Sequence, residues 1–492
     1  MCLDSKRKGE EKMRKLLCMF CWFVIGLAFT AVKEEGKTRE VDPLMKDVVR
    51  DIGSSLQLFV DDWLIAKMEG FSLMLHHPSP EEIVITFDEP WEGNTSGYVT
   101  VFEDEGIFRM YYRGSSHDPK TFKAKHPEFT CYAESKDGIH WVKPKLNLFE
   151  FNGLKKNNIV WQGIGTHNFT PFKDKNPNCP PDARYKALGL GEGGLYAFQS
   201  HDGIHWRLMR EEPVLTKGAF DSQNIAFWDE VRKCYVAYYR EFREGYRDIM
   251  TATSQDFINW SEPKFLDYGS APKEHLYTNA IIPYFRAPHI YLGFPMRFFP
   301  ERQKEIPGGL SDGVFMTSRD GIHWHRWLEA FIRPGTLPQR WVNRNNMTAW
   351  GILVTKSKFA NAPDEISLYS SEGYYQDGNC LRRFTLRMDG FVSVHASYPE
   401  GEFITHPLRF KGKNLVINYS TSAAGKILVE ILNESGEPIR GYSLKDCELI
   451  CGDEIEGVVR WKSGSDLSLL EGRVIRLRFV MQDADLYALQ FR

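Results

Sequence analysis

One seven-residue pattern, Ser-x-Asp-Gly-Ile-His-Trp, recurs along this sequence and constrains the fold more than any other feature. Its copies, of which the third is degenerate, occupy residues 135–141, 200–206, 254–260 and 318–324, and their aspartates are 65, 54 and 64 residues apart. A strand ending at serine, an Asp-Gly turn with positive φ and a returning strand that begins with Ile and Trp form a hairpin. Four such hairpins predict a repeat fold with units of about 50 to 70 residues. We call the turns within these hairpins the Asp turns.

The Asp, His and Trp residues of the pattern are expected to serve structure rather than chemistry. A residue that occurs once in every unit belongs to the unit, and the aspartate side chain can cap the amides of its own turn. The tryptophan is expected to pack between neighbouring sheets.

A second repeat consists of a polar cluster with asparagine directly before an apolar strand. It occurs five times, at residues 94–96, 166–168, 221–224, 277–279 and 344–346. Each cluster is followed by a strand, a turn and a second strand, so that a complete unit has the four antiparallel strands of a propeller blade. Five clusters against four Asp turns predict that the fifth turn has diverged, near residues 371–373.

These repeats predict an all-β chain, a five-bladed β-propeller followed by a C-terminal β-sandwich. Blades are expected over about 90–385, within a propeller domain at 55–388. From 389 to 492 the repeats stop, and alternating strands separated by Gly, Ser and Asn predict the sandwich. No apolar pattern with a period of 3.6 residues lies between the strands, which excludes a parallel α/β fold.

The N-terminal 32 residues have the composition of a targeting segment. Arg14 and Lys15 precede an almost unbroken apolar run at 16–32. This predicts a signal peptide or an uncleaved anchor, then a linker at 33–54, and a secreted or periplasmic protein with no other membrane association. The net charge of −3 gives no indication of a nucleic-acid partner.

Six cysteines follow this segment, without the spacing of zinc ligands, so no metal site is predicted. Buried thiols are expected, with a Cys447–Cys451 disulfide as the alternative.

Propeller topology predicts where a ligand would bind. The first strand of each blade is innermost, so the five polar clusters should meet at one end of the axial pocket, and the antiparallel second strands should return there. The predicted substrate-binding residues are Asn94, His167, Asn168, Asn224, Asn279, Arg113, Arg240, Arg297 and Asp312. If the arginines lack carboxylate partners, they would bind an acidic or sulfated sugar; if paired, they would hold the mouth rigid.

The sequence resembles the five-bladed propeller glycoside hydrolases, the group of arabinanases, invertases and levansucrases (families 32 and 43), over about residues 55–390. It is also similar to exported planctomycete-type members in which a sandwich follows the propeller. The Asp turns resemble blade turns of that group and the Asp-boxes of sialidases. The Trp-Met-Asn-Asp-Pro-Asn-Gly, Arg-Asp-Pro and Glu-Cys motifs of invertase-type enzymes are absent, so no catalytic residue is carried over.

The resemblance implies a glycoside hydrolase acting on a poly- or oligosaccharide, for which two carboxyl groups are needed. Near the first-strand openings, Asp221 is the predicted nucleophile, base or transition-state stabiliser, Glu274 the predicted acid, and Glu92 the substitute for either. Asp174, Asp312 and Glu372 are further candidates.

Two other functions remain open from the sequence. A non-catalytic glycan-binding propeller needs the same polar rim without an acid/base pair, and a lyase or phosphorylase fits the same fold. No cofactor is indicated, although the resemblance allows a cation on the propeller axis.

Overall fold

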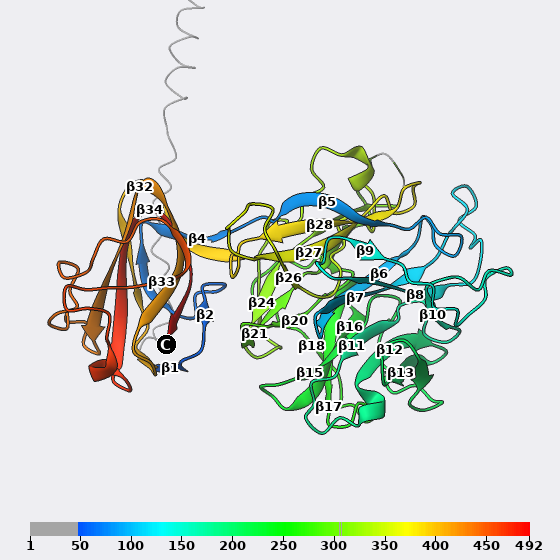
Figure 1. The fold of residues 1–492 in the computed structure, drawn as a ribbon, viewed down its shortest axis with the longest axis horizontal. Helices are drawn as coiled ribbons and strands as arrows, with labels where there is room; N and C mark the ends of the chain where they lie inside the picture. Colours follow the sequence, from blue (N-terminus) through cyan, green and yellow to red (C-terminus); the bar gives the residue numbers. More distant parts are fainter. Residues whose placement is uncertain (1–47, 305, 307) are drawn as a thin grey trace, which may run out of the picture.

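The computed structural model describes residues 48–304, 306 and 308–492, which fold into two β domains lying side by side (Figure 1). Within this part of the chain the helices are three single 3-10 turns, η2 (Pro181–Ala183), η3 (Pro338–Arg340) and η4 (Ser468–Leu470). None of the helices in the described ranges is long and apolar enough to cross a membrane. The predicted targeting segment at 1–32 and most of the linker lie outside the described residues.

Five sheets with antiparallel strands form the blades of the propeller domain. Blade 1 contains β6 (Gly97–Asp104), β7 (Ile107–Gly114), β8 (Phe129–Ser135) and β9 (Trp141–Val142), with β10 (Ile159–Gln162) also paired to β8. Blade 2 contains β11 (Thr170–Lys173), β12 (Tyr185–Gly191), β13 (Gly194–Ser200) and β14 (Trp206–Leu208). Blade 3 contains β15 (Ile225–Asp229), β16 (Cys234–Arg243), β17 (Tyr246–Ser254) and β18 (Lys264–Phe265).

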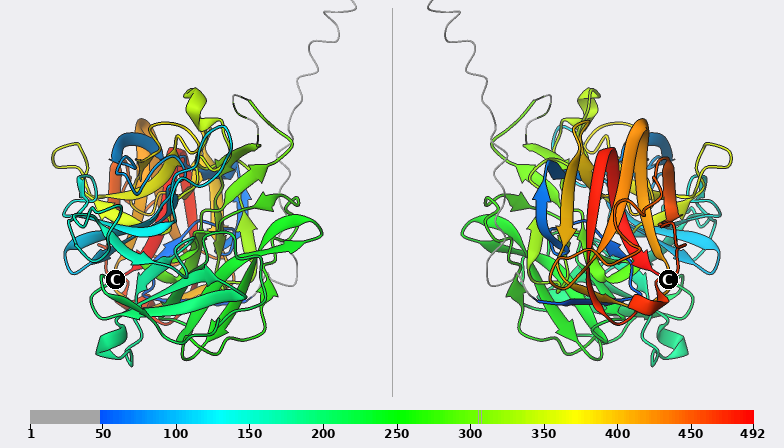
Figure 2. Two further views of the ribbon diagram at one scale, coloured as in Figure 1. Left: turned by 90° about the vertical axis from the view of Figure 1, so that its right-hand side faces the viewer. Right: turned by 90° about the vertical axis from the view of Figure 1, so that its left-hand side faces the viewer.

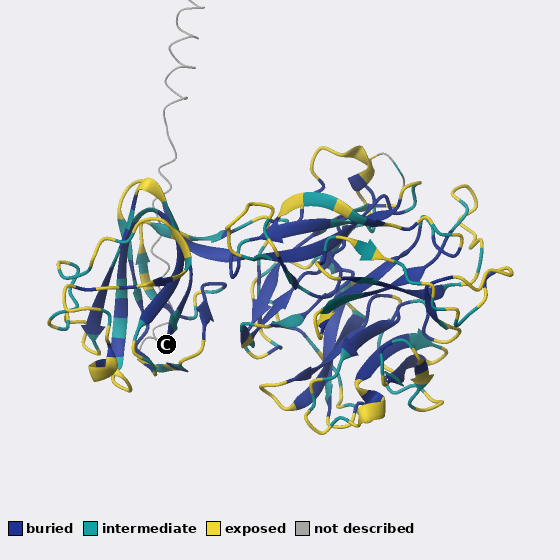
Figure 3. Cartoon of the chain, in the orientation of Figure 1, coloured by how far each residue is buried: buried dark blue, intermediate teal, exposed yellow. Residues whose placement is uncertain are grey.

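Blade 4 contains β20 (Ile282–Tyr284), β21 (Ala287–Gly293), β24 (Met316–Ser318) and β25 (Trp324–Arg326). A three-stranded sheet of β19 (His275–Leu276), β22 (Met296–Phe299) and β23 (Leu310–Gly313) arises from the same stretch of chain. Blade 5 contains β26 (Leu353–Thr355), β27 (Glu365–Glu372), β28 (Cys380–Leu386) and β5 (Ser79–Thr86). Most strands are buried and most loops exposed (Figure 3).

Blade 5 corrects the prediction about the missing Asp turn. Its outermost strand is β5, from the N-terminal side of the propeller, which pairs antiparallel with β28 (Figure 1). The turn of an Asp pattern joins the third and fourth strands of a blade, and here those strands are not consecutive in the chain. The fifth turn has therefore not diverged near 371–373; blade 5 has no place for one, because β5 closes the ring.

The Asp turns have the structural role that was expected. In blade 2, Asp202 Oδ1 accepts hydrogen bonds from the backbone N–H groups of Ile204 (2.9 Å) and His205 (2.8 Å), and the other copies repeat this pair of bonds. A tyrosine of the preceding blade donates to the turn carbonyl, as Tyr111 does to Gly203 (2.8 Å). Tyrosines of blades 3 and 5 bond the turns of blades 4 and 1 in the same way. The turns thus join neighbouring blades.

The second domain is a ten-stranded sheet around a hydrophobic core of its own. Its strands are β1 (Arg50–Gly53), β2 (Gln57–Leu58), β3 (Ile65–Glu69), β4 (Phe71–Leu75), β29 (Val392–Ala396), β30 (Gly401–Thr405), β31 (Leu408–Phe410), β32 (Leu415–Asn433), β33 (Asp453–Val458) and β34 (Val474–Phe491). The long strands β32 and β34 run side by side near the C-terminus (Figure 2). They pair along most of their length, with register shifts between Asn418 and Tyr419 and between Thr421 and Lys426.

Four strands of this domain precede the propeller in the chain, which changes the predicted domain boundary. β1 pairs with β31, β2 with β34, β3 with β30 and β4 with β29. The predicted propeller began at residue 55, but the chain completes part of the second domain before it enters blade 5 at β5. The alternating pattern of these short strands does not indicate which sheet they join. Their position in the sequence, directly before the blades, therefore led to the wrong domain.

The two domains pack on each other through blade 4. Thr317 donates to the carbonyl of Val60 (3.2 Å), and Arg319 forms an ion pair with Asp61 (2.8 Å). Leu58 and Val60 belong to the same buried cluster as the cores of blades 3 and 4. The six described cysteines, including Cys447 and Cys451, are free thiols, so the alternative of a disulfide between those two is not realised.

Candidate functional site

The start of each first strand lies beside the end of the second strand, at one end of the propeller. In blade 1, Gly97 pairs with Arg113. In blade 3, an ion pair of 3.8 Å joins Asp221, before β15, to Arg240 in β16. In the sheet next to blade 4, Leu276 pairs with Arg297. We call this end of the propeller the mouth.

Side chains from all five blades contact one another at the mouth. Tyr98 of blade 1 and Tyr277, ahead of blade 4, share a hydrogen bond between their hydroxyl groups (2.7 Å). Arg113 donates to the hydroxyl of Tyr374, in blade 5 (2.7 Å), and Arg344 donates to the same oxygen (3.0 Å). The mouth cluster is defined as Tyr98, Arg113, Glu128, His167, Asp221, Arg240, Arg247, Tyr277, Arg344 and Tyr374.

A hydrogen-bonded chain of two carboxylates and one imidazole lies in this cluster. His167 Nδ1 is 2.9 Å from Glu128 Oε2, and His167 Nε2 is 2.9 Å from Asp221 Oδ1. The side chains are 25% (Glu128), 29% (His167) and 57% (Asp221) exposed, so the chain runs from the protein toward solvent. Arg113 lies 3.5 Å from Glu128 and holds its inner end.

The charges of this chain support one another. Burial opposes the imidazolium, but the hydrogen bonds to Asp221 and Glu128 outweigh it and raise the pKa of His167. Burial likewise opposes ionised carboxylates, yet the bonds from His167 and nearby arginine charges lower the pKa of both Glu128 and Asp221. The arrangement therefore favours an imidazolium between two ionised carboxylates.

Beneath the mouth, side chains cross the propeller axis. Gln223 of blade 3 donates to the carbonyl of Val99 (3.0 Å) and the hydroxyl of Thr100 (3.2 Å), both in blade 1. The bond between Tyr98 and Tyr277 also joins two blades that are not neighbours. These links connect non-neighbouring blades across the axis, close to the chain of Glu128, His167 and Asp221.

Glu274, the predicted acid, is held in ion pairs away from His167. It lies 2.8 Å from Arg326 and 3.3 Å from Arg297. Arg297 also forms a two-point contact with Asp312 (2.9 and 2.8 Å). The charge of Arg297 is therefore balanced by Glu274 and Asp312. This matches the alternative in which paired arginines hold the mouth rigid instead of binding an acidic sugar.

Glu92, the predicted substitute, is inside blade 1. Its side chain is fully buried, and it accepts hydrogen bonds from Tyr112 (2.5 Å), Lys143 (2.7 Å) and the backbone of Glu89 (3.1 Å). The further candidates are also paired: Asp174 with Lys186, and Glu372 with Arg340 (3.2 Å) and Arg382 (2.8 Å).

The repeated asparagines hydrogen-bond the protein's own backbone. Asn168 donates to the carbonyls of Phe220 (2.7 Å) and Ser222 (2.6 Å), which join blade 2 to blade 3. Asn224 donates to the same two carbonyls and Asn279 to those of Gln223 and Tyr238. Asn94, which is partly exposed, exchanges two hydrogen bonds with the backbone of His117 (3.0 and 2.9 Å). These amides connect blades and loops, so we assign them no contact with substrate.

Six members of the mouth cluster were not among the predicted site residues: Tyr98, Glu128, Arg247, Tyr277, Arg344 and Tyr374. Glu128 directly precedes β8, whose first residue Phe129 pairs with Gly114 at the end of β7. The start of a third strand thus lies at the same end of a blade as the start of the first. Applying that rule to every blade, as was done only for Asp312, would have selected Glu128.

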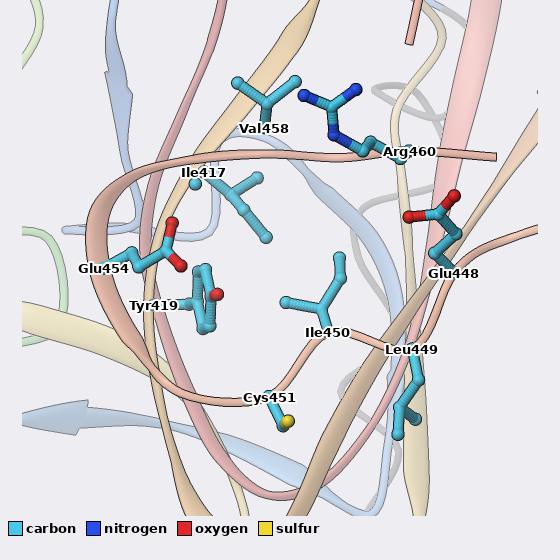
Figure 4. A pocket seen from close by; sticks show the side chains of 10 residues that line it. Ile417, Tyr419, Glu448, Leu449, Ile450, Cys451, Glu454, Val458 and Arg460 are labelled. Carbon is cyan, nitrogen blue, oxygen red and sulfur yellow. The ribbon is translucent and has the colours of Figure 1, made fainter. Parts of the chain in front are cut away.

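A pocket of about 200 Å³ lies in the second domain, far along the chain from the mouth residues (Figure 4). Tyr419, Ile450, Cys451 and Glu454 are among its lining residues. Over the described ranges, no group of three or more His, Cys, Asp and Glu side chains is arranged to hold a metal ion.

No family model matches the sequence, and no curated protein matches it. Solved structures with similarity include a glycoside hydrolase (14% identity, TM-score 0.44, covering 64% of this chain and 93% of that chain). A glycosyl hydrolase from Bacteroides ovatus is 14% identical, with a TM-score of 0.42 over 69% of this chain and 99% of that chain. A fructofuranosidase from Schwanniomyces occidentalis is 11% identical, with a TM-score of 0.37 over 85% and 98%. Similarity at this level transfers neither an activity nor a site residue to the chain.

Proposed function

We propose that the protein is a glycoside hydrolase whose site is the mouth cluster. The observation that carries the proposal is the chain Glu128–His167–Asp221, which brings a protonated group and an ionised carboxylate together at the open end of the propeller. Arg247 and Arg344 are partly exposed and provide hydrogen-bond donors that sugar hydroxyl groups can accept, while the buried tyrosines of the cluster pack against its arginines.

In this proposal His167 supplies the proton and Asp221 acts at the anomeric carbon. His167 is the member of the chain whose pKa is raised, so it is the proton donor in this proposal. Its Nε2–H bonds Asp221 in this structure, and in the reaction this bond would break so that the proton passes to the oxygen of the leaving sugar as the glycosidic C–O bond breaks. Glu128 holds Nδ1 and stabilises the imidazolium. Asp221 is the more exposed carboxylate and its pKa is lowered, which suits a nucleophile or the base that takes a proton from attacking water.

A second candidate, a glycan-binding propeller without catalysis, is favoured by one observation. Both carboxylates of the chain have a lowered pKa, so neither is a carboxylic acid of the kind glycosidases normally use. Binding needs only the arginines and tyrosines of the cluster.

A hydrolysis screen against a glycan library decides between the candidates. Wild type is compared with Asp221→Asn, Glu128→Gln and His167→Gln, with folding of each variant checked by circular dichroism. We expect Asp221→Asn and His167→Gln to lose about 10² to 10⁴ in rate. Glu274→Gln serves as the control, because Glu274 is outside the mouth cluster, and it should keep its rate below its melting temperature.

Cleavage by wild type that survives the substitutions at Asp221 and His167 would overturn the assignment. Loss of cleavage only in Glu274→Gln would move the site to the ion pairs of Arg297. Glycan binding by wild type without any cleavage would establish the second candidate.

A further inference from the structure

The mouth cluster has more positive than negative charge. Three arginines surround the ring of Tyr277, with guanidinium carbons 5.2 Å (Arg240), 5.9 Å (Arg247) and 5.4 Å (Arg344) from its centroid. Arg113 is a fourth, and His167 adds a fifth positive charge when protonated. The opposing carboxylates of the cluster are Glu128 and Asp221, and His167 already bonds both.

Two of these arginines have no ion pair within the described residues. Arg247 contacts the rings of Phe242 (5.5 Å) and Phe298 (5.2 Å), and its guanidinium makes no hydrogen bond to the described protein. Arg344 has one hydrogen bond, to Tyr374. Arg240 is 5% exposed, its nearest carboxylate oxygen is 3.8 Å away, and its Nη1 is buried without a partner.

Aromatic contacts alone do not compensate for this concentration of charge. A cation–π contact contributes about 0.5 to 2 kcal/mol, whereas a buried charged donor without a partner costs several. Burial and the positive charge of Arg240 lower the pKa of Arg247, which shows that the cations repel one another. An anion placed among them would remove that repulsion and provide the missing acceptors.

We infer that Arg240, Arg247 and Arg344 bind an anionic group on the glycan, either the carboxylate of a uronic acid or a sulfate ester. The inference rests on the proposed function insofar as it places the glycan at the mouth. A guanidinium group donates two parallel hydrogen bonds to such oxyanions, which present at least two equivalent oxygens. Phe242, in β16, lies beside Arg240 and Arg247, whose guanidinium carbons are each 5.5 Å from its ring centroid, and at 45% exposed it offers a surface on which the sugar can stack.

The test measures binding of the full chain by affinity electrophoresis in matched polysaccharide pairs. Polygalacturonate against its methyl ester isolates the carboxylate, and dextran sulfate against dextran isolates the sulfate. Arg247→Gln is the main variant, because its guanidinium makes no hydrogen bond that folding would lose. Arg207→Gln, an exposed arginine on the outer strand of blade 2, is the control.

We expect wild type to prefer one anionic member of the pairs, and the member preferred identifies the group. Arg247→Gln should weaken that binding about tenfold or more, since a hydrogen bond to a charged group is lost, while Arg207→Gln should not. Equal affinity for the charged and neutral members, or no effect of Arg247→Gln, would overturn the inference.

The outcomes also separate this inference from the proposed function. Cleavage of a neutral glycan that depends on Asp221 would leave the hydrolase proposal standing and reject the acidic substrate. Anion-selective binding that depends on Arg247, with no glycan cleaved, would support the arginine site and reject the hydrolase.

Discussion

Replacing Glu92 should destabilise the propeller without changing the chemistry of the mouth cluster. All three partners of its carboxylate are donors: the hydroxyl of Tyr112, the ammonium of Lys143 and the backbone N–H of Glu89. Glu92→Ala removes every acceptor at once. Glu92→Gln keeps one oxygen but turns an NH₂ group toward a donor.

The expected loss of unfolding free energy follows from the burial of the Glu92 ion pair. Removing one partner of a buried ion pair costs about 3 to 5 kcal/mol. The Lys143 side chain is 16% exposed and recovers part of its hydration, which places Glu92→Ala toward the lower end of that range. Glu92→Gln leaves one donor unsatisfied, at about 1 to 3 kcal/mol. For a cooperative unit of about 300 residues, the alanine variant should melt about 5 to 6 °C lower.

The assay combines thermal unfolding with glycan binding and cleavage measured well below the lowered melting temperature. Glu105→Gln is the control, because Glu105 forms ion pairs at the surface, where its loss costs at most about 1 kcal/mol. We expect Glu92→Ala to lose the most stability, Glu92→Gln less and Glu105→Gln the least. The activity per folded molecule should be unchanged in all three variants. A Glu92→Gln variant that keeps its melting temperature but loses cleavage would refute the structural role and return Glu92 to the active site.

Three further predictions concern the turns, the histidine and the closing strand. Asp202→Ala should lower the unfolding free energy by about 1 to 3 kcal/mol in urea titrations, because its turn amides lose their acceptor; an unchanged midpoint would contradict this. The folded state raises the pKa of His167, so its stabilisation is complete below the ordinary histidine pKa and disappears as the pH rises through the raised value. His167→Gln should therefore cost more stability at pH 5.5 than at pH 8.5, and an equal cost would be evidence against the imidazolium. Ile85→Ala in β5 (6% exposed) should cost about 2 to 5 kcal/mol, whereas Ile83→Ala on the same strand (47% exposed) should cost little; equal losses would argue against β5 as part of the core.

The repeats predicted the strands within blades because they depend on local interactions. An Asp turn is specified by residues three apart, and the hydrogen bonds from the turn amides to the aspartate stay within that distance. The pairing of β1 to β4 with strands more than 300 residues later depends on no local pattern, since any short alternating strand fits several sheets. The sequence thus predicted the blades and missed the route of the chain between domains.

The candidate site was predicted in part for the same reason. Asp221, His167, Arg113 and Arg240 were found because topology brings first-strand openings and second-strand ends together. Whether an acidic residue is free or paired depends on contacts between distant positions. Glu274 meets Arg326, 52 residues later, and nothing near Glu274 in the sequence indicates that partner.

The count of repeats contained more information than the repeats themselves. The sequence contains five asparagine clusters but four Asp turns, and the missing turn was interpreted as divergence of the last copy. The difference instead follows from ring closure, because the outermost strand of blade 5 precedes blade 1 in the chain. Such closure leaves one blade whose third and fourth strands have no turn between them, and it brings the two ends of the propeller together beside blade 5. With both ends adjacent, the chain can build part of the second domain before the propeller and the rest after it. The missing turn therefore predicts that β5 closes the ring. It also predicts that the segments before and after the propeller leave it beside blade 5, where both can join the second domain.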